Sequence, residues 1–391
     1  MGPLLADVQE EVPGVLREEV GVKALGVIVN PIAGMGGAVA LKGTDSAEIL
    51  RRARDLGAVA SAPTKARRAL AQLANLRRDV NIVTCCGSMG EAAAREAGFE
   101  PRVLDIGQGG ETTGADTRRA AEAMVAEQVD LILFAGGDGT ARDLCEAIGS
   151  GFPVLGVPAG VKIHSGVYAA TPERAGELAS RFLRGERFES RQAEVMDIDE
   201  DAFRAGSVRA KLHGYLQVPY EPRCLQGRKC GSSSDAVELL GVVKQTVSEM
   251  LSDVLYLVGC GTTTQAVLEA LGLGGSLLGV DAIKGGSLVG TDLSETEILR
   301  LVEPGNTKMI LTAIGGQGHV FGRGNLQLSP NVIRGVGREN IVVIATPQKI
   351  RSLFRKPLLV DTGDPELDEE LTGYMPVITG YRQKSMMRIE C

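Results

Sequence analysis

The sequence predicts an α/β protein of two domains: an N-terminal doubly wound parallel-sheet (Rossmann-like) domain, and a second mixed α/β domain with a β-hairpin insert. Short apolar runs alternate with helical stretches of about 10 to 15 residues, a pattern typical of parallel sheets covered on both faces. The chain has 391 residues, enough for two or three domains of ~100 to 200 residues each. Its 51 glycines, about 13 per cent against a usual 7 per cent, cluster between the apolar runs.

The first domain is expected to cover residues 1–187, with residues 1–20 as a short arm. Apolar runs bounded by glycine or polar residues predict five strands: Gly26–Asn30, Val80–Thr84, Arg102–Leu104, Asp130–Ala135 and Val154–Val157. Apolar residues at three- and four-residue spacing predict six helices: Ala47–Leu56, Ala66–Leu76, Glu91–Ala97, Thr117–Glu127, Thr140–Ile148 and Pro172–Leu183. The basic residues of this region, including Lys65 and Arg68, are interpreted as solvated helix faces.

The second domain is expected to cover residues 188–391, because the pattern changes near residue 188. Ala193–Ile198 and Val208–Val218 alternate apolar and polar residues, as in an antiparallel hairpin. The alternation of helix and strand then resumes. The expected helices are Val237–Leu251 and Thr264–Leu271, and the expected strands are Val254–Val258, Leu277–Val280, Met309–Ala313, Ile341–Ala345 and Leu358–Val360.

Composition and charge exclude several classes of function. The formal net charge of −7 argues against a globally basic nucleic-acid binder, and the absence of Trp leaves few side chains for base stacking. The seven cysteines and three histidines lack metal-site spacing, so no residue is assigned as a metal ligand. No apolar run approaches the ~18 residues of a membrane span, and the acidic first residues do not resemble a signal peptide. We expect a cytoplasmic protein that binds neither nucleic acid nor membranes.

The strongest motif follows the expected strand Asp130–Ala135. Its residues are Gly136, Gly137, Asp138, Gly139 and Thr140. Glycines allow the backbone to approach a ligand, and the N-terminus of the following helix presents free N–H groups to an anion. Asp138 would accept a proton from an attacking hydroxyl or organise a metal, because a carboxylate repels phosphate. The alternative is a tight strand-to-helix turn with Asp138 as its N-cap.

A second motif lies at the end of the strand Gly26–Asn30. Its candidate ligand-binding residues are Asn30, Pro31, Gly34, Gly36 and Gly37. Because ligands bind at the carboxyl ends of the strands in open parallel sheets, both glycine-rich turns should open on one edge. Nearby candidates for phosphate contacts are Lys42, Thr44 and Asp45, with an ordinary polar loop as the alternative.

The second domain carries two weaker motifs. The turn after the strand Val254–Val258 contains Gly261, Thr262, Thr263 and Thr264, whose hydroxyl and N–H groups would face one point. Such a turn is also close to a generic phosphate-binding turn. The run from residue 315 to residue 325 combines glycines with Gln, His, Arg and Asn, and its candidates are Gly316 and Gln317. The alternative for this run is a flexible loop, with a structural role for its histidine.

These motifs together resemble a known family. GGDGT after an apolar strand, preceded by an Asn-Pro-x-x-Gly turn, resembles the NAD kinase and diacylglycerol kinase superfamily. With KGTD (42–45), TTGADTRRAA (112–121), GGDGTARD (136–143) and GVPAGVKIHS (156–165), the chain resembles the ATP-NAD kinases, a family that includes the acetoin-catabolism X proteins. The last segment contains Lys162, a further candidate for cofactor binding.

The resemblance implies phosphorylation of the adenosine ribose 2′-hydroxyl of NAD to give NADP, with ATP or polyphosphate as donor and Mg²⁺. It implies that Asp138 is the general base or metal-organising carboxylate, that the active site lies between the domains, and that Gly261–Thr264 contacts the nucleotide. The usual Asn-Glu pair of NAD kinases has no clear counterpart. The alternatives are therefore a kinase of the same fold for another small acceptor, and a non-enzymatic nucleotide-binding accessory or sensor protein of a catabolic operon. We expect a homo-oligomer that binds small-molecule nucleotides.

Overall fold

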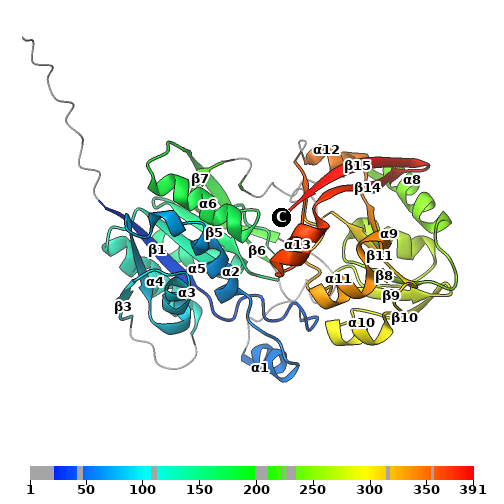
Figure 1. Ribbon diagram of the computed structural model, residues 1–391, viewed down its shortest axis with the longest axis horizontal. Coiled ribbons are helices and arrows are strands. Elements are labelled where there is room, and N and C mark those ends of the chain that lie inside the picture. Colours follow the sequence, from blue (N-terminus) through cyan, green and yellow to red (C-terminus); the bar gives the residue numbers. More distant parts are fainter. Residues whose placement is uncertain are drawn as a thin grey trace, which may run out of the picture.

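The computed structural model describes residues 22–41, 47–106, 112–161, 163–198, 210–221, 224–225, 235–313, 318–353 and 356–391. Two domains lie side by side, and the C-terminus ends at the junction between them (Figure 1). The chain is α/β overall, with a Rossmann-like parallel sheet followed by a second, mixed sheet, so the predicted fold class is confirmed. The arm expected over residues 1–20 lies outside the described residues.

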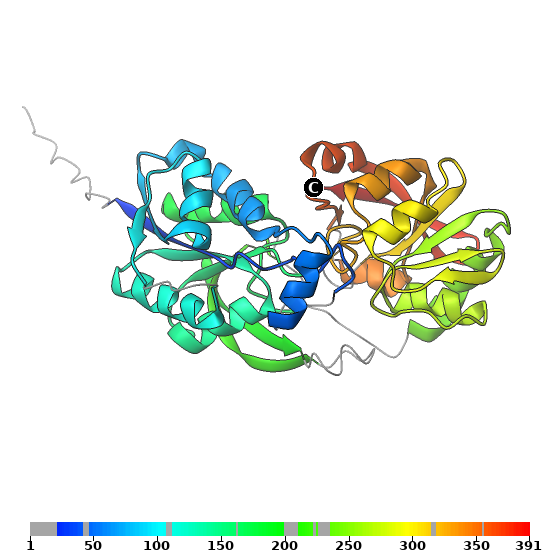
Figure 2. The same ribbon diagram turned by 90° about the horizontal axis from the view of Figure 1, so that it is seen from below.

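The first domain is built on a five-stranded parallel sheet of order β3-β2-β1-β4-β5. Its strands are β1 (Lys23–Val29), β2 (Val80–Cys85), β3 (Arg102–Leu104), β4 (Leu131–Gly136) and β5 (Val154–Pro158). Its helices are α1 (Ala47–Asp55), α2 (Ala62–Ala71), α3 (Glu91–Glu96), α4 (Gly114–Ala126), α5 (Asp138–Ile148) and α6 (Pro172–Leu183), with 3-10 turns at Ala74–Leu76 and Gly87–Met89. Helices lie on both sides of the sheet (Figure 2). Every residue of β4 and β5 is therefore buried, which explains their continuous apolar sequences.

A long antiparallel hairpin follows, formed by β6 (Glu189–Ile198) and β7 (Ala210–Tyr220). Val195, Leu216 and Val218 are almost fully buried and belong to the hydrophobic core of the first sheet. The domain boundary at residue 188 stays a prediction. Because the hairpin and Leu225 pack in the first core, we propose that the structural boundary lies after residue 225.

The second domain has an eight-stranded mixed sheet of order β10-β9-β8-β11-β12-β14-β15-β13. The strands are β8 (Leu255–Val258), β9 (Asp281–Lys284), β10 (Ser287–Gly290), β11 (Thr307–Thr312), β12 (Ile341–Ile344), β13 (Leu358–Leu359), β14 (Gly373–Gly380) and β15 (Gln383–Glu390). The neighbours β8, β11, β12 and β14 run parallel, so their carboxyl ends form one edge. Two separate clusters of buried hydrophobic residues pack against this sheet.

The helices of the second domain are mostly short. They are α8 (Asp235–Ser248), α9 (Thr262–Ala270), α10 (Glu295–Leu301), α11 (Pro330–Val336), α12 (Pro347–Ser352) and α13 (Pro365–Leu371), with a 3-10 turn at Arg338–Asn340. The strand expected at Leu277–Val280 is wrong, because these residues form a turn and the strand begins at Asp281. The Ser276 hydroxyl accepts the N–H of Gly279 at 2.9 Å, and the Asp281 carboxylate accepts the N–H of Ser276 at 2.6 Å. These two hydrogen bonds close the turn.

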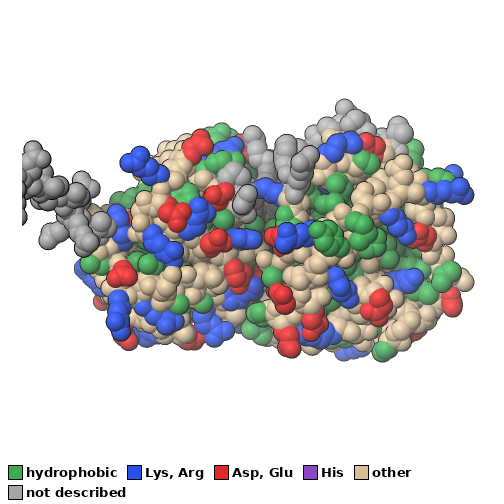
Figure 3. Space-filling model, turned by 45° about the horizontal axis from the view of Figure 1, so that its top comes forward, with side chains coloured by type: hydrophobic (Ala, Val, Ile, Leu, Met, Phe, Trp, Pro, Cys, Tyr) green, Lys and Arg blue, Asp and Glu red, His purple; other side chains and the backbone are tan. Residues whose placement is uncertain are grey.

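The surface carries charges of both signs. Acidic and basic side chains are interspersed over the face shown in Figure 3. Among the described residues, no helix is both long enough and apolar enough to cross a membrane.

Candidate functional site

The two glycine-rich motifs of the first domain meet where the strand order reverses. β1 and β4 are adjacent parallel strands, while the chain continues outward from β1 to β2 and from β4 to β5. In an open α/β sheet this switch point is the usual ligand-binding crevice. Asn30 follows β1 directly and donates its backbone N–H to Ala135 O of β4 at 2.9 Å. Asn30 and Asp138 therefore lie on neighbouring strand ends.

A side-chain hydrogen bond joins these two motifs. Asn30 Nδ2 donates to Thr140 Oγ1 at 3.0 Å, and Asn30 Oδ1 accepts the N–H of Ile32 at 3.2 Å. Thr140 is 2 % exposed, because it lies against the carboxyl end of β4. A Cβ on Gly136 would lie 2.3 Å from Thr140 Oγ1, so this position accommodates only glycine without displacing the threonine. Both turns are thus fixed as one unit.

Asp138 occupies the first position of α5, with Gly137 as the N-cap residue. One carboxylate oxygen accepts the N–H of His164 at 2.7 Å, and the other accepts the N–H of Ser165 at 3.0 Å. The two backbone donors and the helix N-terminus stabilise the negative charge and fix the orientation of the carboxylate. Because each carboxylate oxygen has two lone pairs, Asp138 retains acceptor capacity for a substrate hydroxyl.

The turn after β5 forms the wall beside Asp138. Gly160 packs against the glycine turn so closely that a Cβ on it would lie 2.6 Å from Gly137 Cα. Gly34, with φ of +81°, would place a Cβ 2.3 Å from Ala159 O. All three glycine-rich turns of the first domain therefore contact one another, and the glycines make this approach possible.

Tyr168 contacts the glycine turn of residues 136–137 from the protein interior. It is fully buried, and its hydroxyl donates to Gly137 O. Burial, together with the charge of Asp138, raises the pKa of Tyr168 well above its usual value, so the phenol remains a donor at neutral pH. Tyr168 is a positioning residue that the sequence analysis missed, because a single Tyr in an apolar stretch carries no distinctive signal.

Mg²⁺, which the resemblance implies, fits this site through a small number of protein ligands. Within the described ranges, no group of three or more His, Cys, Asp or Glu side chains could hold a metal ion. Mg²⁺ usually keeps several waters and binds proteins through one or two carboxylates together with substrate phosphates. The single carboxylate of Asp138 is enough for such binding, because each of its oxygens can still accept or coordinate after taking one backbone N–H.

The third motif lies at the carboxyl edge of the second sheet. Gly261, with φ of +131°, precedes α9, and Thr263 and Thr264 in its first turn are buried. Lys349 Nζ from α12 donates to Thr263 Oγ1 at 3.1 Å and to Thr312 Oγ1 at 3.0 Å. A lysine beside a helix N-terminus is an arrangement that favours anions. The cluster of Thr263, Thr312 and Lys349 thus lies at the ends of three strands, β8, β11 and β12.

Sequence analysis did not single out Lys349 and Thr312. The Thr346 hydroxyl caps α12 by accepting the backbone N–H of Lys349 at 3.2 Å. This hydrogen bond fixes the backbone of Lys349 in the first turn of the helix. The run Thr-Pro-x-Lys after the apolar strand Ile341–Ala345 was the available signal, since Thr-Pro is typical of a helix start.

The two sheet edges face the junction between the domains. Leu326 of the second domain fills the space beside Gly37, where a Cβ would lie 2.2 Å from Leu326 Cδ1. Gly324 donates its N–H to Val161 O at 3.3 Å and accepts from Cys260 Sγ at 3.0 Å. Gly324 thus contacts both the turn beside Asp138 and the residue before Gly261, which links the two motifs across the junction.

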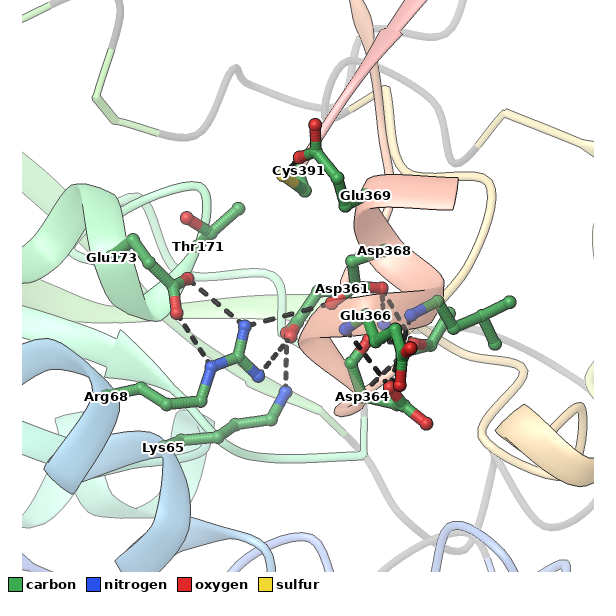
Figure 4. A network of polar contacts seen from close by, with 12 residues as sticks. Lys65, Arg68, Thr171, Glu173, Asp361, Asp364, Glu366, Asp368, Glu369 and Cys391 are labelled. Atoms are coloured by element: carbon green, nitrogen blue, oxygen red, sulfur yellow. Dashed lines mark hydrogen bonds and ion pairs between the residues drawn. The ribbon is translucent and has the colours of Figure 1, made fainter. Parts of the chain in front are cut away.

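A buried ion-pair network holds the junction together (Figure 4). Asp361 of the second domain is fully buried and accepts from Lys65 Nζ at 2.6 Å and from Arg68 Nη1 at 3.0 Å, both on α2. Arg68 also pairs with Glu173 of α6 at 2.7 Å. Burial alone would raise the pKa of Asp361, but the charges of Lys65 and Arg68 outweigh it and hold this pKa well below its usual range. The solvated-face interpretation of Lys65 and Arg68 is therefore wrong, because both side chains point into the junction.

The remaining sequence candidates fall into two groups. Pro31, Gly36, Gly139 and Thr262 lie in the described turns, and their roles in binding stay predictions. The other candidates lie outside the described residues, and their roles also stay predictions: Lys42, Thr44, Asp45, Lys162, Gly316 and Gln317.

Comparison with known families gives two matches. Residues 25–187 match the family model of the ATP-NAD kinase N-terminal domain, and residues 251–389 match that of the ATP-NAD kinase C-terminal domain. The two models follow each other along most of the chain. A comparison with curated proteins found no match.

Proposed function

Because the chain belongs to the ATP-NAD kinase family and is a kinase-like phosphotransferase, we propose that it phosphorylates the adenosine ribose 2′-hydroxyl of NAD to give NADP. ATP or polyphosphate is the proposed donor, with Mg²⁺. The observation that carries the proposal is the Asp138 carboxylate, which is held by the N–H groups of His164 and Ser165 at the switch point of the first sheet.

The proposed reaction is an in-line transfer. The 2′-oxygen of NAD forms a bond to the terminal phosphorus of the donor, while the bond from that phosphorus to the bridging oxygen breaks and releases ADP or shortened polyphosphate. Asp138 accepts a hydrogen bond from the 2′-hydroxyl, orients it and receives its proton. Such transfer depends mainly on positioning and charge neutralisation, which suits a site with one carboxylate and many backbone donors.

Other residues bind and orient the substrates in this proposal. The N-terminus of α5, beside the glycine turns at 34–37 and 136–137, supplies backbone N–H groups to phosphate oxygens in this proposal. Gly261–Thr264 and Lys349 supply N–H, hydroxyl and ammonium donors for a nucleotide phosphate on the second domain. In its alternative role, Asp138 would hold Mg²⁺ together with substrate phosphates, and the ion would neutralise charge on the phosphoryl oxygens.

The experiment supplies purified protein with Mg²⁺, NAD and either ATP or polyphosphate, and detects NADP with an NADP-specific dehydrogenase. We expect NADP in at least one donor arm, and its loss when EDTA removes the metal. Parallel arms replace NAD with other nucleotides or small diols and follow donor consumption. Consumption with another acceptor, without NADP from NAD, would contradict the proposed acceptor and favour a kinase of the same fold with a different substrate. Nucleotide binding without turnover in any arm would favour the accessory or sensor alternative.

A cytoplasmic location and a homo-oligomeric state stay predictions. Light scattering coupled to size-exclusion chromatography tests the oligomeric state directly.

A further inference from the structure

The antiparallel hairpin β6–β7 is hydrogen-bonded to the turn that holds Asp138. Gly166 donates its N–H to Glu194 O of β6 at 2.8 Å. Ser165 Oγ accepts the N–H of Met196 at 2.9 Å and donates to Met196 O at 3.4 Å. Alternate residues of a strand direct their backbone groups to the same edge, so Glu194 and Met196 meet the turn along one edge of β6. Residues 165 and 166 therefore take the place of a neighbouring strand along this edge.

Ser165 connects the hairpin to the carboxylate of Asp138 through a single residue. Its backbone N–H donates to Asp138 at 3.0 Å, while its side chain makes both hydrogen bonds to Met196. The residue is only 1 % exposed. A serine hydroxyl can donate one hydrogen bond and also accept, so it serves the N–H and the C=O of Met196 at once. An alanine at this position would remove this partner from both backbone groups.

The hairpin is irregular at the contact with Ser165. Val195 lies opposite Gly214 of β7, but the next residue, Met196, lies opposite Leu212, so the register shifts between them. Such a bulge bends a strand and changes the direction of its groups, and bulges are common beside active sites. This bulge lies at the point where β6 meets the turn that holds the carboxylate.

The second element that orients Asp138 also contacts the hairpin. Asp138 begins α5, and Cys145 of the same helix donates from Sγ to Tyr215 O of β7 at 3.6 Å. A Cβ on Gly214 would lie 2.7 Å from Cys145 Sγ, so the helix and the strand are in close contact. The hairpin itself packs into the hydrophobic core of the first sheet. It is therefore a fixed support for both α5 and the turn that contains Ser165.

We propose that Ser165 is a positioning residue for the phosphotransfer: its hydroxyl anchors the turn to β6 and thereby aims the N–H groups of His164 and Ser165 at Asp138. The inference rests on the proposed function, in which this carboxylate orients the attacking hydroxyl. Without the anchor the turn can shift, and the carboxylate shifts with it because both of its oxygens accept N–H groups of the turn. A misplacement of about 1 Å in a reacting group can cost about 10²-fold in rate.

The test measures kcat and KM of NADP formation in variants of Ser165. We expect kcat to fall by about 10- to 100-fold in Ser165→Ala, with KM near its wild-type value, because other residues bind the substrates. Ser165→Thr keeps the hydroxyl, whereas Ser165→Val has nearly the same shape and lacks it. We therefore expect a higher kcat in Ser165→Thr than in Ser165→Val. Equal kcat in wild type and Ser165→Ala would overturn the proposal, and so would equal kcat in Ser165→Thr and Ser165→Val.

Ser180→Ala is the matched control. Ser180 of α6 is 3 % exposed, and its Oγ accepts from Arg184 Nη2 at 3.2 Å at the C-terminal end of this helix. The change removes the same kind of hydroxyl from a similarly buried position of the same domain. We expect kcat to stay near the wild-type value. A comparable fall of kcat in Ser180→Ala and Ser165→Ala would indicate general destabilisation and overturn the role of Ser165.

Hydrogen exchange of backbone amides tests the anchor without relying on turnover. Ser165→Ala should speed exchange in peptides that cover residues 163–167 and 194–196, and leave α6 unchanged. Faster exchange together with a lower kcat is the expected result. Faster exchange with wild-type kcat would reject the role of Ser165 and leave the proposed kinase activity intact. Wild-type protein without turnover on NAD or any other acceptor would instead reject the phosphotransfer, and the role of Ser165 with it.

Discussion

Asn30 donates its side-chain amide to Thr140 Oγ1 at 3.0 Å, and the two residues are 110 positions apart in the chain. This hydrogen bond joins the turn after β1 to the first turn of α5, on either side of the switch point. It fixes the relative position of the two turns before any substrate arrives. A pre-organised site of this kind is what phosphoryl transfer requires, since catalysis depends on positioning.

The first prediction concerns this bond. Asn30→Ala removes the donor to Thr140 and the acceptor for the Ile32 N–H, so we expect a loss of about 1 to 3 kcal/mol in the free energy of unfolding. We also expect turnover to fall, because both turns lose their connection. Urea unfolding and the NADP assay check these effects. Asn81→Ala, at an exposed position of β2, is the control and should change neither quantity appreciably.

The second prediction concerns the contact between glycine turns. Gly160→Ala places a methyl group 2.6 Å from Gly137 Cα, so one turn must shift and turnover should fall sharply. Overpacking of this kind costs about 1 to 3 kcal/mol. Gly151→Ala is the control, because no atom lies within 4 Å of the added Cβ. Equal activity in the two variants would show that the close approach of the turns is not needed.

The third prediction concerns the junction. Asp361→Asn removes a fully buried carboxylate, so that Lys65 loses its charge partner and Arg68 keeps Glu173 but loses Asp361. We expect a loss of about 3 to 5 kcal/mol in stability. Glu186→Gln, which breaks a surface pair with Arg181, should cost less than about 1 kcal/mol. Urea unfolding at pH 7 compares the two variants, and equal losses would contradict a central role for the buried network.

The fourth prediction is the pH dependence of this effect. The pKa of Asp361 is lower in the folded protein than in the unfolded chain, so its stabilising contribution is complete above the unfolded value of about 3.9 and declines below it. The difference in stability between wild type and Asp361→Asn should therefore narrow as the pH falls below about 4. Urea unfolding at about pH 7, 4 and 2.5 measures it. A difference that stays constant over this range would contradict the assignment.

Sequence patterns predicted the first domain well because β1, β2, β4 and β5 are mostly buried apolar runs and glycines mark the turns that follow β1 and β4. Pro172–Leu183 and Arg102–Leu104 were predicted with their observed bounds. The short helices of the second domain were missed, although α11, α12 and α13 each begin with proline after a capping Ser329, Thr346 or Asp364. Hydrophobic periodicity needs a longer window than these six- and seven-residue helices offer, so only the caps could identify them.

The candidate site was partly accessible to sequence analysis. Asn30 and Asp138 were placed on one sheet edge because parallel strands share their carboxyl ends, and their closeness follows from the strand order. Contacts between domains could not be predicted in this way. Lys349 reaches Thr263 from 86 positions away, and Asp361 reaches Lys65 from 296 positions away, so neither pairing leaves a local pattern. The basic residues of α2 even suggested solvent exposure, because a helix shows the same charge pattern in its sequence whether its basic side chains face water or a buried carboxylate.

The most direct test of the central claim is the rate of NADP formation by Asp138→Asn, measured with NAD, Mg²⁺ and the active donor. Loss of the carboxylate should lower kcat by about 10² to 10⁴-fold, while NAD affinity and the folded state persist. Asp130→Asn is the matched control, because its carboxylate also accepts a backbone N–H, that of Ala24 at 2.8 Å, at the amino edge of the same sheet. The account predicts near wild-type turnover for the control and its loss in Asp138→Asn. NADP formation by Asp138→Asn at the wild-type rate would contradict it.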